Sequence, residues 1–218
     1  MNKPMHNASV NEAEGELGKW SANEMRLLRM TELFQLKPAI MKKAESYLDE
    51  LKNALALELT QGTYPPGAEL TNGRLTRGEN NKGFPFLSLD IPQLFTKTEY
   101  FTFRALFWWG HYLGFSLILK GKKLPEQTAN LLANQKQAVC RDIYLSCAPT
   151  PWEWERTEDN FKNLYDTPGG EIRGIVESVQ YLKLCRFYPF DEPGFDALEW
   201  APLGVQTFRD FNGLTAVS

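Results

Sequence analysis

The residue types best suited to binding chemistry lie in a short basic segment near the middle of the chain. Arg74 and Arg77 stand three residues apart, and Glu79 and Asn80 follow a glycine directly after them. A guanidinium group presents paired N–H donors in one plane, which suits a carboxylate or a phosphate. Arg104 is the next arginine along the chain and can supply a third cation. The pattern predicts a site for a small anionic ligand. The alternative is an exposed ion pair between Arg77 and Glu79, which contributes little to stability.

Tryptophan is the second feature that suggests binding. Four of the six tryptophans occur in two pairs, Trp108 with Trp109 and Trp152 with Trp154. Exposed indole faces recognise sugars, bases and cations. If one member of a pair fills the core, its partner can line a cleft, so we predict Trp108 and Trp109 beside the anion site. Packing in the core, or a homodimer contact through Trp152 and Trp154, is the alternative.

An acid–base site is a further hypothesis. Glu79, Asp90 and His111 are the candidate catalytic residues, and Glu153 and Glu155 can form an acid pair if their strand faces a groove. Such a role requires a pKa shifted by burial. His111 has aromatic neighbours in the sequence, so a packed, hydrogen-bonded histidine is the alternative interpretation.

Recognised catalytic and cofactor motifs are absent from the sequence. The chain has no GxxxxGK[ST] phosphate loop, no GxGxxG, no HExxH, no GxSxG and no paired CxxC. His111, Cys140 and Cys147 together supply three ligand-type side chains, but their spacing is not typical of a zinc site. We therefore predict no metal and no cofactor, and the sequence alone leaves it undecided whether the protein is an enzyme.

The charge of the chain is low overall but unevenly distributed. The net charge is −3 and the pI about 5.6, without the basic footprint of a nucleic-acid binder. Residues 70–125 hold eight Lys or Arg against three acids, whereas residues 151–218 hold six against twelve. We expect a small anionic ligand or a protein partner, possible homodimers, and no nucleic-acid partner.

Targeting signals are the next consideration. Residues 1–20 are polar and resemble a flexible tail rather than a signal peptide. The apolar segment 103–119 is short for a membrane span and contains Arg104. The three cysteines are odd in number and lack CxxC spacing, as in reduced thiols. These features favour a soluble, cytoplasmic protein with no membrane partner.

Capping and periodicity predict the helices. Ser21 and Glu24 form a capping box that opens a helix over 22–36. Pro38 suits the first turn of a second helix over 38–60, where apolar residues recur every three or four positions. Thr96 and Glu99 form another capping box, which predicts a helix over 97–109. Further helices are expected at 125–138, 171–187 and 203–211.

Alternating and turn-flanked segments predict the strands. Segments 73–77 and 84–91 flank a turn-rich stretch and indicate a hairpin whose second arm is central in its sheet. Strands are also expected at 111–120 and 142–147, with an edge strand at 152–155. The sequence predicts an α+β fold: a mixed or antiparallel sheet of about four to five strands, packed by an N-terminal helical pair and two to three further helices. Residues 21–218 are expected to form a single domain.

Overall fold

The computed structural model describes residues 18–216 of the chain. Residues 18–42 form one part, the arm, and residues 43–216 form a second, the body. The five described α-helices are α1 (Ala22–Leu28), α2 (Thr31–Leu59), α3 (Leu124–Asn134), α4 (Gly169–Val179) and α5 (Trp200–Thr215). Two short 3₁₀ turns, Ala138–Asp142 and Phe195–Ala197, complete the helical elements.

A seven-stranded antiparallel sheet forms the centre of the body. Its first four strands follow one another as a meander: β1 (Arg74–Asn81), β2 (Phe84–Phe95), β3 (Tyr100–Trp108) and β4 (Tyr112–Lys120). β7 (Leu182–Pro189) pairs with β4, and the short strands β5 (Tyr144–Ser146) and β6 (Phe161–Asn163) follow it at the far edge. The predicted α+β class with an antiparallel sheet is confirmed.

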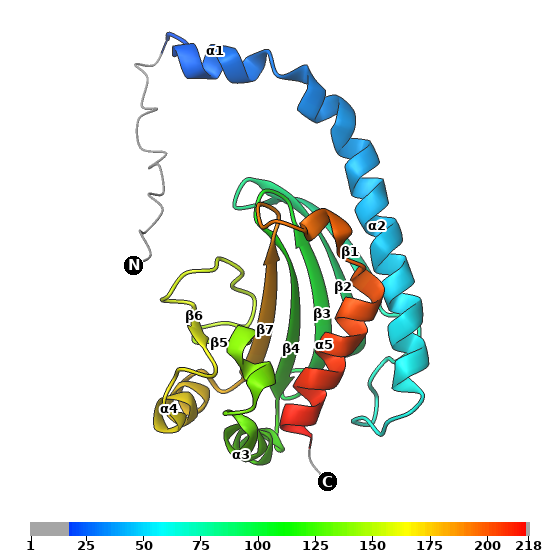
Figure 1. Cartoon of the computed structure of the whole chain (residues 1–218), viewed down its shortest axis with the longest axis vertical. Helices are drawn as coiled ribbons and strands as arrows, with labels where there is room; N and C mark the ends of the chain where they lie inside the picture. The colour runs from blue at the N-terminus through cyan, green and yellow to red at the C-terminus, as the bar shows by residue number, and fades with distance from the viewer. Residues whose placement is uncertain (1–17, 217–218) are drawn as a thin grey trace. The chain divides into compact units, whose positions relative to one another are not determined.

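One face of the sheet is covered by helices. α5 lies along this face in Figure 1, beside the C-terminal half of α2. Phe103 and Phe115 from the sheet stack at 5.9 Å, and Phe103 contacts Phe208 of α5 edge-on at 5.4 Å. From α2, Leu48, Leu51, Leu55 and Leu59 are at most 2 % exposed. This is the main hydrophobic core, and it confirms the apolar stripe predicted for the long helix.

The N-terminal helices differ from the prediction in their limits. The Ser21 hydroxyl accepts a hydrogen bond from the Glu24 amide, and the Glu24 carboxylate accepts one from the Ser21 amide, so the capping box is confirmed. The first helix ends at Leu28 rather than near residue 36, because α2 already begins at Thr31. Pro38 therefore lies inside α2 and not in its first turn.

The predicted hairpin is confirmed, with a tighter turn. β1 runs to Asn81 and β2 starts at Phe84, so only Lys82 and Gly83 form the loop. Both have positive φ, 52° and 90°, which is the backbone conformation of a two-residue hairpin turn. β2 lies between β1 and β3, as expected for a central strand.

The helix predicted over 97–109 is wrong, because this segment is strand β3. The Thr96 hydroxyl does accept hydrogen bonds from the Thr98 and Glu99 amides, as in a capping box, but the turn leads into a strand. Phe101, Phe103 and Phe107 lie on one buried face of this strand, and Leu106 and Trp108 are buried on the other, which suits a sheet with two buried faces. Tertiary burial therefore decides this element.

The helix predicted over 171–187 is half correct. α4 ends at Val179, and Gln180 takes a left-handed conformation with φ 61°. β7 then begins at Leu182. β3 and β7, together with β6, account for a sheet of seven strands where four to five were expected. Among the smaller differences, α3 ends four residues early, β5 is shorter, and α5 is longer than the predicted segment 203–211.

The edge strand predicted over 152–155 is also wrong. This segment has no regular secondary structure. It belongs to an irregular stretch, residues 151–156, which we call the strap because side chains of β4 and β7 hold its carbonyl groups.

The described residues bear on two expectations from the sequence, the absence of a membrane-spanning helix and the presence of free cysteines. Within residues 18–216 no helix combines the length and apolar character that crossing a membrane requires. All three cysteines in this range are free thiols. The predicted tail, residues 1–20, lies mostly outside the described part.

The close packing of α2 on α5 gives a first prediction. A Cβ added at Gly204 would lie 2.5 Å from Leu51 Cδ1 and 3.1 Å from Phe115 Cε1, whereas one added at Gly213 of the same helix meets nothing within 4 Å. We expect Gly204→Val to lower the free energy of unfolding by about 1–3 kcal/mol through overpacking.

The matched control is Gly213→Val, which changes the same residue type at an exposed position of α5. It should alter the free energy of unfolding by less than about 0.5 kcal/mol. Urea denaturation of both variants measures the difference, and equal stabilities would contradict the packing described.

Candidate functional site

The open face of the sheet, opposite α5, carries a row of charged residues. The strand register places Arg74 of β1 opposite Asp90 of β2, and Asp90 opposite Arg104 of β3. Because the side chains of paired residues point to the same face, these three lie side by side. Two of the predicted binding residues and one predicted acid are thus brought together by a register that no local pattern specifies.

Arg104 and Asp90 form a bidentate ion pair. Arg104 Nε lies 2.7 Å from Asp90 Oδ1, and Nη2 lies 2.8 Å from Oδ2. The side chains are 13 % and 3 % exposed, so both charges are largely removed from water. A buried charge is tolerated when it is paired in this way. Asp90 therefore serves to fix and neutralise Arg104, which does not suit it as a free general base.

Arg74 differs from Arg104 in having no such partner. Within residues 18–216 its side chain makes no ion pair and no hydrogen bond, although it lies in the same row. Since Asp90 already balances Arg104, Arg74 leaves this part of the sheet with one uncompensated positive charge. That charge is available to a ligand.

An aromatic wall stands beside the charged row. Phe95, Tyr100 and Trp152 pack against one another, with ring centroids between 5.4 and 6.1 Å apart. The guanidinium carbon of Arg104 lies 5.0 Å from the centre of the Trp152 ring, in a cation–π contact. The wall thus joins the end of β2 and the start of β3 to the strap.

The strap is held on the open face by hydrogen bonds to its backbone. Lys183 Nζ of β7 donates to the carbonyl groups of Pro151 and Glu153, both at 2.9 Å. The Tyr112 hydroxyl of β4 donates to the Trp154 carbonyl. Lys183 is buried, and burial lowers the pKa of its amine. Its two hydrogen bonds go to carbonyl groups of the strap.

Side chains add a second set of contacts to the strap. Lys82, in the β1–β2 turn, lies 2.9 Å from a Glu153 carboxylate oxygen and 2.7 Å from one of Glu155. Trp154 packs edge-on against Phe86 and Trp108. Glu153 and Glu155, predicted as an acid pair, are therefore ion-paired to one lysine and tie the strap to the hairpin.

Between the charged row and the strap lies a cleft of about 430 Å³. Its charged lining consists of Arg74, Asp90 and Arg104, and the rest is aromatic or polar and uncharged. The lining residues are Arg74, Thr76, Phe86, Ser88, Asp90, Gln93, Phe95, Thr96, Tyr100, Arg104, Trp152 and Trp154. A concave site that combines aromatic side chains with polar groups is typical of small-molecule binding.

Several predicted binding residues lie away from this cleft. Arg77 forms an exposed ion pair with Glu79 at 3.1 Å, and neither lines the cleft. The Asn80 side chain accepts a hydrogen bond from the Gly83 amide, which stabilises the hairpin turn. Trp108 is 1 % exposed, and its indole nitrogen donates to the Asn81 carbonyl.

The remaining tryptophan of that pair is also outside the cleft. Trp109 contacts the Phe107 ring edge-on at 6.4 Å and donates its amide to the Pro85 carbonyl. Trp152 and Trp154, which the sequence suggested for a dimer contact, are the tryptophans that line the cleft.

The three candidate catalytic residues are held by different partners. Asp90 is paired with Arg104 and Glu79 with Arg77, whereas the His111 ring stacks on Trp108 with centroids 3.6 Å apart. Burial lowers the pKa of His111, and its Nε2 has no hydrogen-bond partner within the described residues. This arrangement resembles the packed histidine that the sequence offered as the alternative.

The described residues contain no cluster of three or more His, Cys, Asp or Glu able to hold a metal ion. Burial raises the pKa of the Cys140 and Cys147 thiols, which keeps them in the neutral form. Cys185 is buried beside Lys183, and its pKa is raised to about 11.

Sequence reasoning missed most of the uncharged lining. Ser88, Gln93, Phe95 and Tyr100 were not singled out, although Ser88 shares a strand face with Asp90. The alternation of side chains along β2 places Phe86, Ser88 and Asp90 on one face and could have predicted that Ser88 lies beside Asp90. No pattern indicated Lys183, which meets the strap from 30 residues away.

Comparison with known proteins gives no relative from which to carry a function. No family model matches the chain, and neither a curated protein nor a solved structure is similar to it.

The buried ion pair gives a prediction on stability. We expect Arg104→Met to lower the free energy of unfolding by about 3–5 kcal/mol, because it leaves the Asp90 carboxylate buried without a counter-charge. Adding Asp90→Asn should recover part of the loss. Chemical denaturation of the single and double variants measures the coupling.

Arg77→Met is the control, since its pair with Glu79 is more than half exposed. It should cost less than about 1 kcal/mol. Equal losses for the two arginines would show that the Asp90–Arg104 pair is not buried as described.

His111 gives a prediction on pH. Because its folded-state pKa lies below the unfolded value, the unfolded chain binds more protons at mildly acidic pH, and stability falls as His111 is protonated. We expect His111→Gln to reduce the loss of stability between about pH 7 and about pH 5. Denaturation midpoints at the two pH values test this, and an unchanged loss would exclude His111 as its source.

Proposed function

We propose that the protein binds a small organic anion in the cleft between the strap and strands β1–β3. The observation that carries this proposal is the exposed guanidinium of Arg74, which has no partner within the described residues and lies beside an aromatic wall. The ligand class follows from the lining: a carboxylate or phosphate to meet Arg74, joined to a ring or other apolar body that packs on Trp152 and Tyr100.

The charge of the cleft supports an anion rather than a cation. Two arginines and one aspartate line it, so its formal charge is +1 before a ligand enters. The bidentate pair with Asp90 engages Nε and Nη2 of Arg104 and fixes the orientation of the guanidinium plane. A fixed cation loses little conformational entropy when a ligand binds. Arg104 is thus a preformed part of the site, whereas the Arg74 side chain is exposed.

Size and polarity agree with the same class. A volume of about 430 Å³ lies in the range of small-molecule sites. Ser88, Gln93 and Thr96 add hydroxyl and amide groups that can accept or donate hydrogen bonds within the cleft. The geometry supports binding more directly than catalysis, because the candidate acids and His111 are engaged with other residues.

The test compares charged probes with neutral analogues of the same shape. We expect benzoate and phenyl phosphate to raise the thermal midpoint of the full chain more than benzamide does. Arg74→Ala should weaken binding of the anionic probes by about ten- to hundredfold, the effect of a charge-assisted hydrogen bond, without lowering the midpoint of the free protein.

Arg77→Ala is the matched control, an exposed arginine three residues away on the same strand that does not line the cleft. It should leave probe binding unchanged. Equal responses to benzoate and benzamide, or an Arg74→Ala variant that binds as well as the parent, would overturn the proposal.

A further inference from the structure

The arm exposes far more apolar surface than the rest of the described chain. Eight of the eleven large apolar side chains that are exposed lie between residues 20 and 40, in about a tenth of the described length. They are Trp20, Leu27, Leu28, Met30, Leu33, Phe34, Leu36 and Ile40. Trp20 is 68 % and Phe34 70 % exposed. Clustered exposure of this kind marks an interaction surface.

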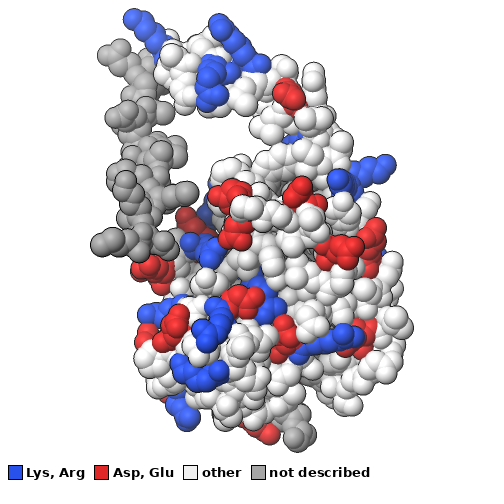
Figure 2. Space-filling view, viewed as in Figure 1, with Lys and Arg blue, Asp and Glu red and all other residues white. Residues whose placement is uncertain are grey.

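The arm also carries a charge opposite to that of the whole chain. Residues 18–42 contain five Lys or Arg and two Glu, a net charge of +3, whereas the chain has −3. Residues 1–17 hold three Glu and one Lys, so the positive charge of the arm does not extend to the start of the chain. Figure 2 shows Lys and Arg side chains around α1, at the top of that view.

Basic and apolar residues lie on different sides of α1 and share one face at the start of α2. In α1, Leu27 and Leu28 project away from Arg26, by the helical period of about 3.6 residues. In α2, Leu33, Leu36 and Ile40 follow one another at spacings of three and four, which is one helix face. In α1 the basic side chain therefore lies opposite Leu27 and Leu28, whereas in α2 Lys37 lies on the same face as Leu33, Leu36 and Ile40.

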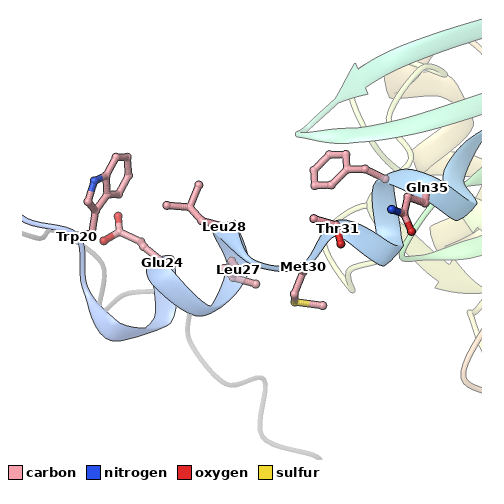
Figure 3. A pocket seen from close by; sticks show the side chains of 8 residues that line it. Trp20, Glu24, Leu27, Leu28, Met30, Thr31 and Gln35 are labelled. Atoms are coloured by element: carbon pink, nitrogen blue, oxygen red, sulfur yellow. The ribbon is translucent and has the colours of Figure 1, made fainter.

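Apolar side chains of the arm, together with Glu24, Thr31 and Gln35, line an open groove of about 620 Å³. Figure 3 shows Trp20 and Leu28 on one side of the ribbon and Met30 on the other. A protein partner would need a shape complementary to these splayed side chains, and the cores of protein interfaces are depleted of lysine. A fluid lipid interface needs no such complementarity and favours Trp, Phe and Leu beside Lys and Arg.

We infer that the arm docks on an anionic lipid bilayer, lying in the interface with its apolar side chains among the headgroups. The expectation of no membrane partner came from the lack of a spanning segment, and an interfacial helix requires none. Basic residues near an anionic leaflet each add attraction, so the charge of the arm selects the lipid and its apolar residues provide the insertion.

The experiment is sedimentation of the full chain with vesicles. We expect binding to vesicles of phosphatidylcholine with about one third phosphatidylserine, and at least about tenfold weaker binding to phosphatidylcholine alone. High salt should weaken the first interaction. The double variants Leu28→Ser/Phe34→Ser and Arg26→Glu/Arg29→Glu should each lower binding to the anionic vesicles by about tenfold or more.

Two control variants separate the arm from the rest of the chain. Leu57→Ser changes an apolar residue of α2 that is 71 % exposed but lies outside the arm, and Lys122→Glu changes an exposed lysine after β4. Both should bind vesicles as the parent does. The mass of each protein in solution is measured in parallel.

Three results would overturn the inference. The first is no binding to anionic vesicles, and the second is binding that the arm variants leave unchanged. The third is a dimer that dissociates in Leu28→Ser/Phe34→Ser while vesicles bind no protein, which would assign the arm to a second copy of the chain. None of these results bears on the cleft, because its residues are unchanged in every variant.

Discussion

The register between β2 and β3 is the constraint on which the candidate site depends. It places Asp90 opposite Arg104, and the two form a bidentate pair that is almost removed from water. A shift of the register by one residue would turn Asp90 toward the phenylalanine core, where a carboxylate has no partner. The ion pair and the hydrophobic face therefore select the same register. Arg74, one strand further, is placed opposite Asp90 by the register of the β1–β2 hairpin.

The strap is held on the same sheet by side chains of β4 and β7 that bind its backbone carbonyl groups. Its backbone is irregular, so its carbonyl groups need partners from elsewhere. Lys183 and Tyr112 supply them from β7 and β4, and the ion pairs of Lys82 hold the adjoining carboxylates. Burial makes the Lys183 amine costly to charge, and its two carbonyl contacts offset part of that cost. These contacts hold the strap on the sheet, where Trp152 lines the cleft.

Most apolar side chains of α2 are buried in the body and exposed in the arm. In the body, Leu48, Leu51 and Leu55 of α2 are fully buried, while in the arm Leu33, Phe34 and Leu36 of the same helix are exposed. A helix whose apolar stripe continues beyond its packed region has surface left for a partner. The cleft and the arm are thus separate surfaces with different chemistry. The cleft is lined by two arginines, one aspartate and several aromatic side chains, and the arm carries basic residues and exposed apolar side chains on its helices.

By itself the sequence determined the features that local interactions control. The Ser21–Glu24 capping box, the apolar stripe of α2, the β1–β2 hairpin and the α+β class all follow from hydrogen bonds or periodicity within a few residues. Arg74 and Arg104 were also predicted as anion-binding residues, because the chemistry of an arginine side chain does not depend on the fold. Tertiary structure alone decided that 100–108 and 182–189 are strands, since burial in the sheet outweighs helix propensity. Strand 182–189 also pairs with segments that are distant along the chain. Tertiary structure likewise decided that Trp152 rather than Trp108 lines the cleft, because Lys183, far along the chain, holds the strap that carries Trp152. It also decided that Arg77 lies outside the cleft.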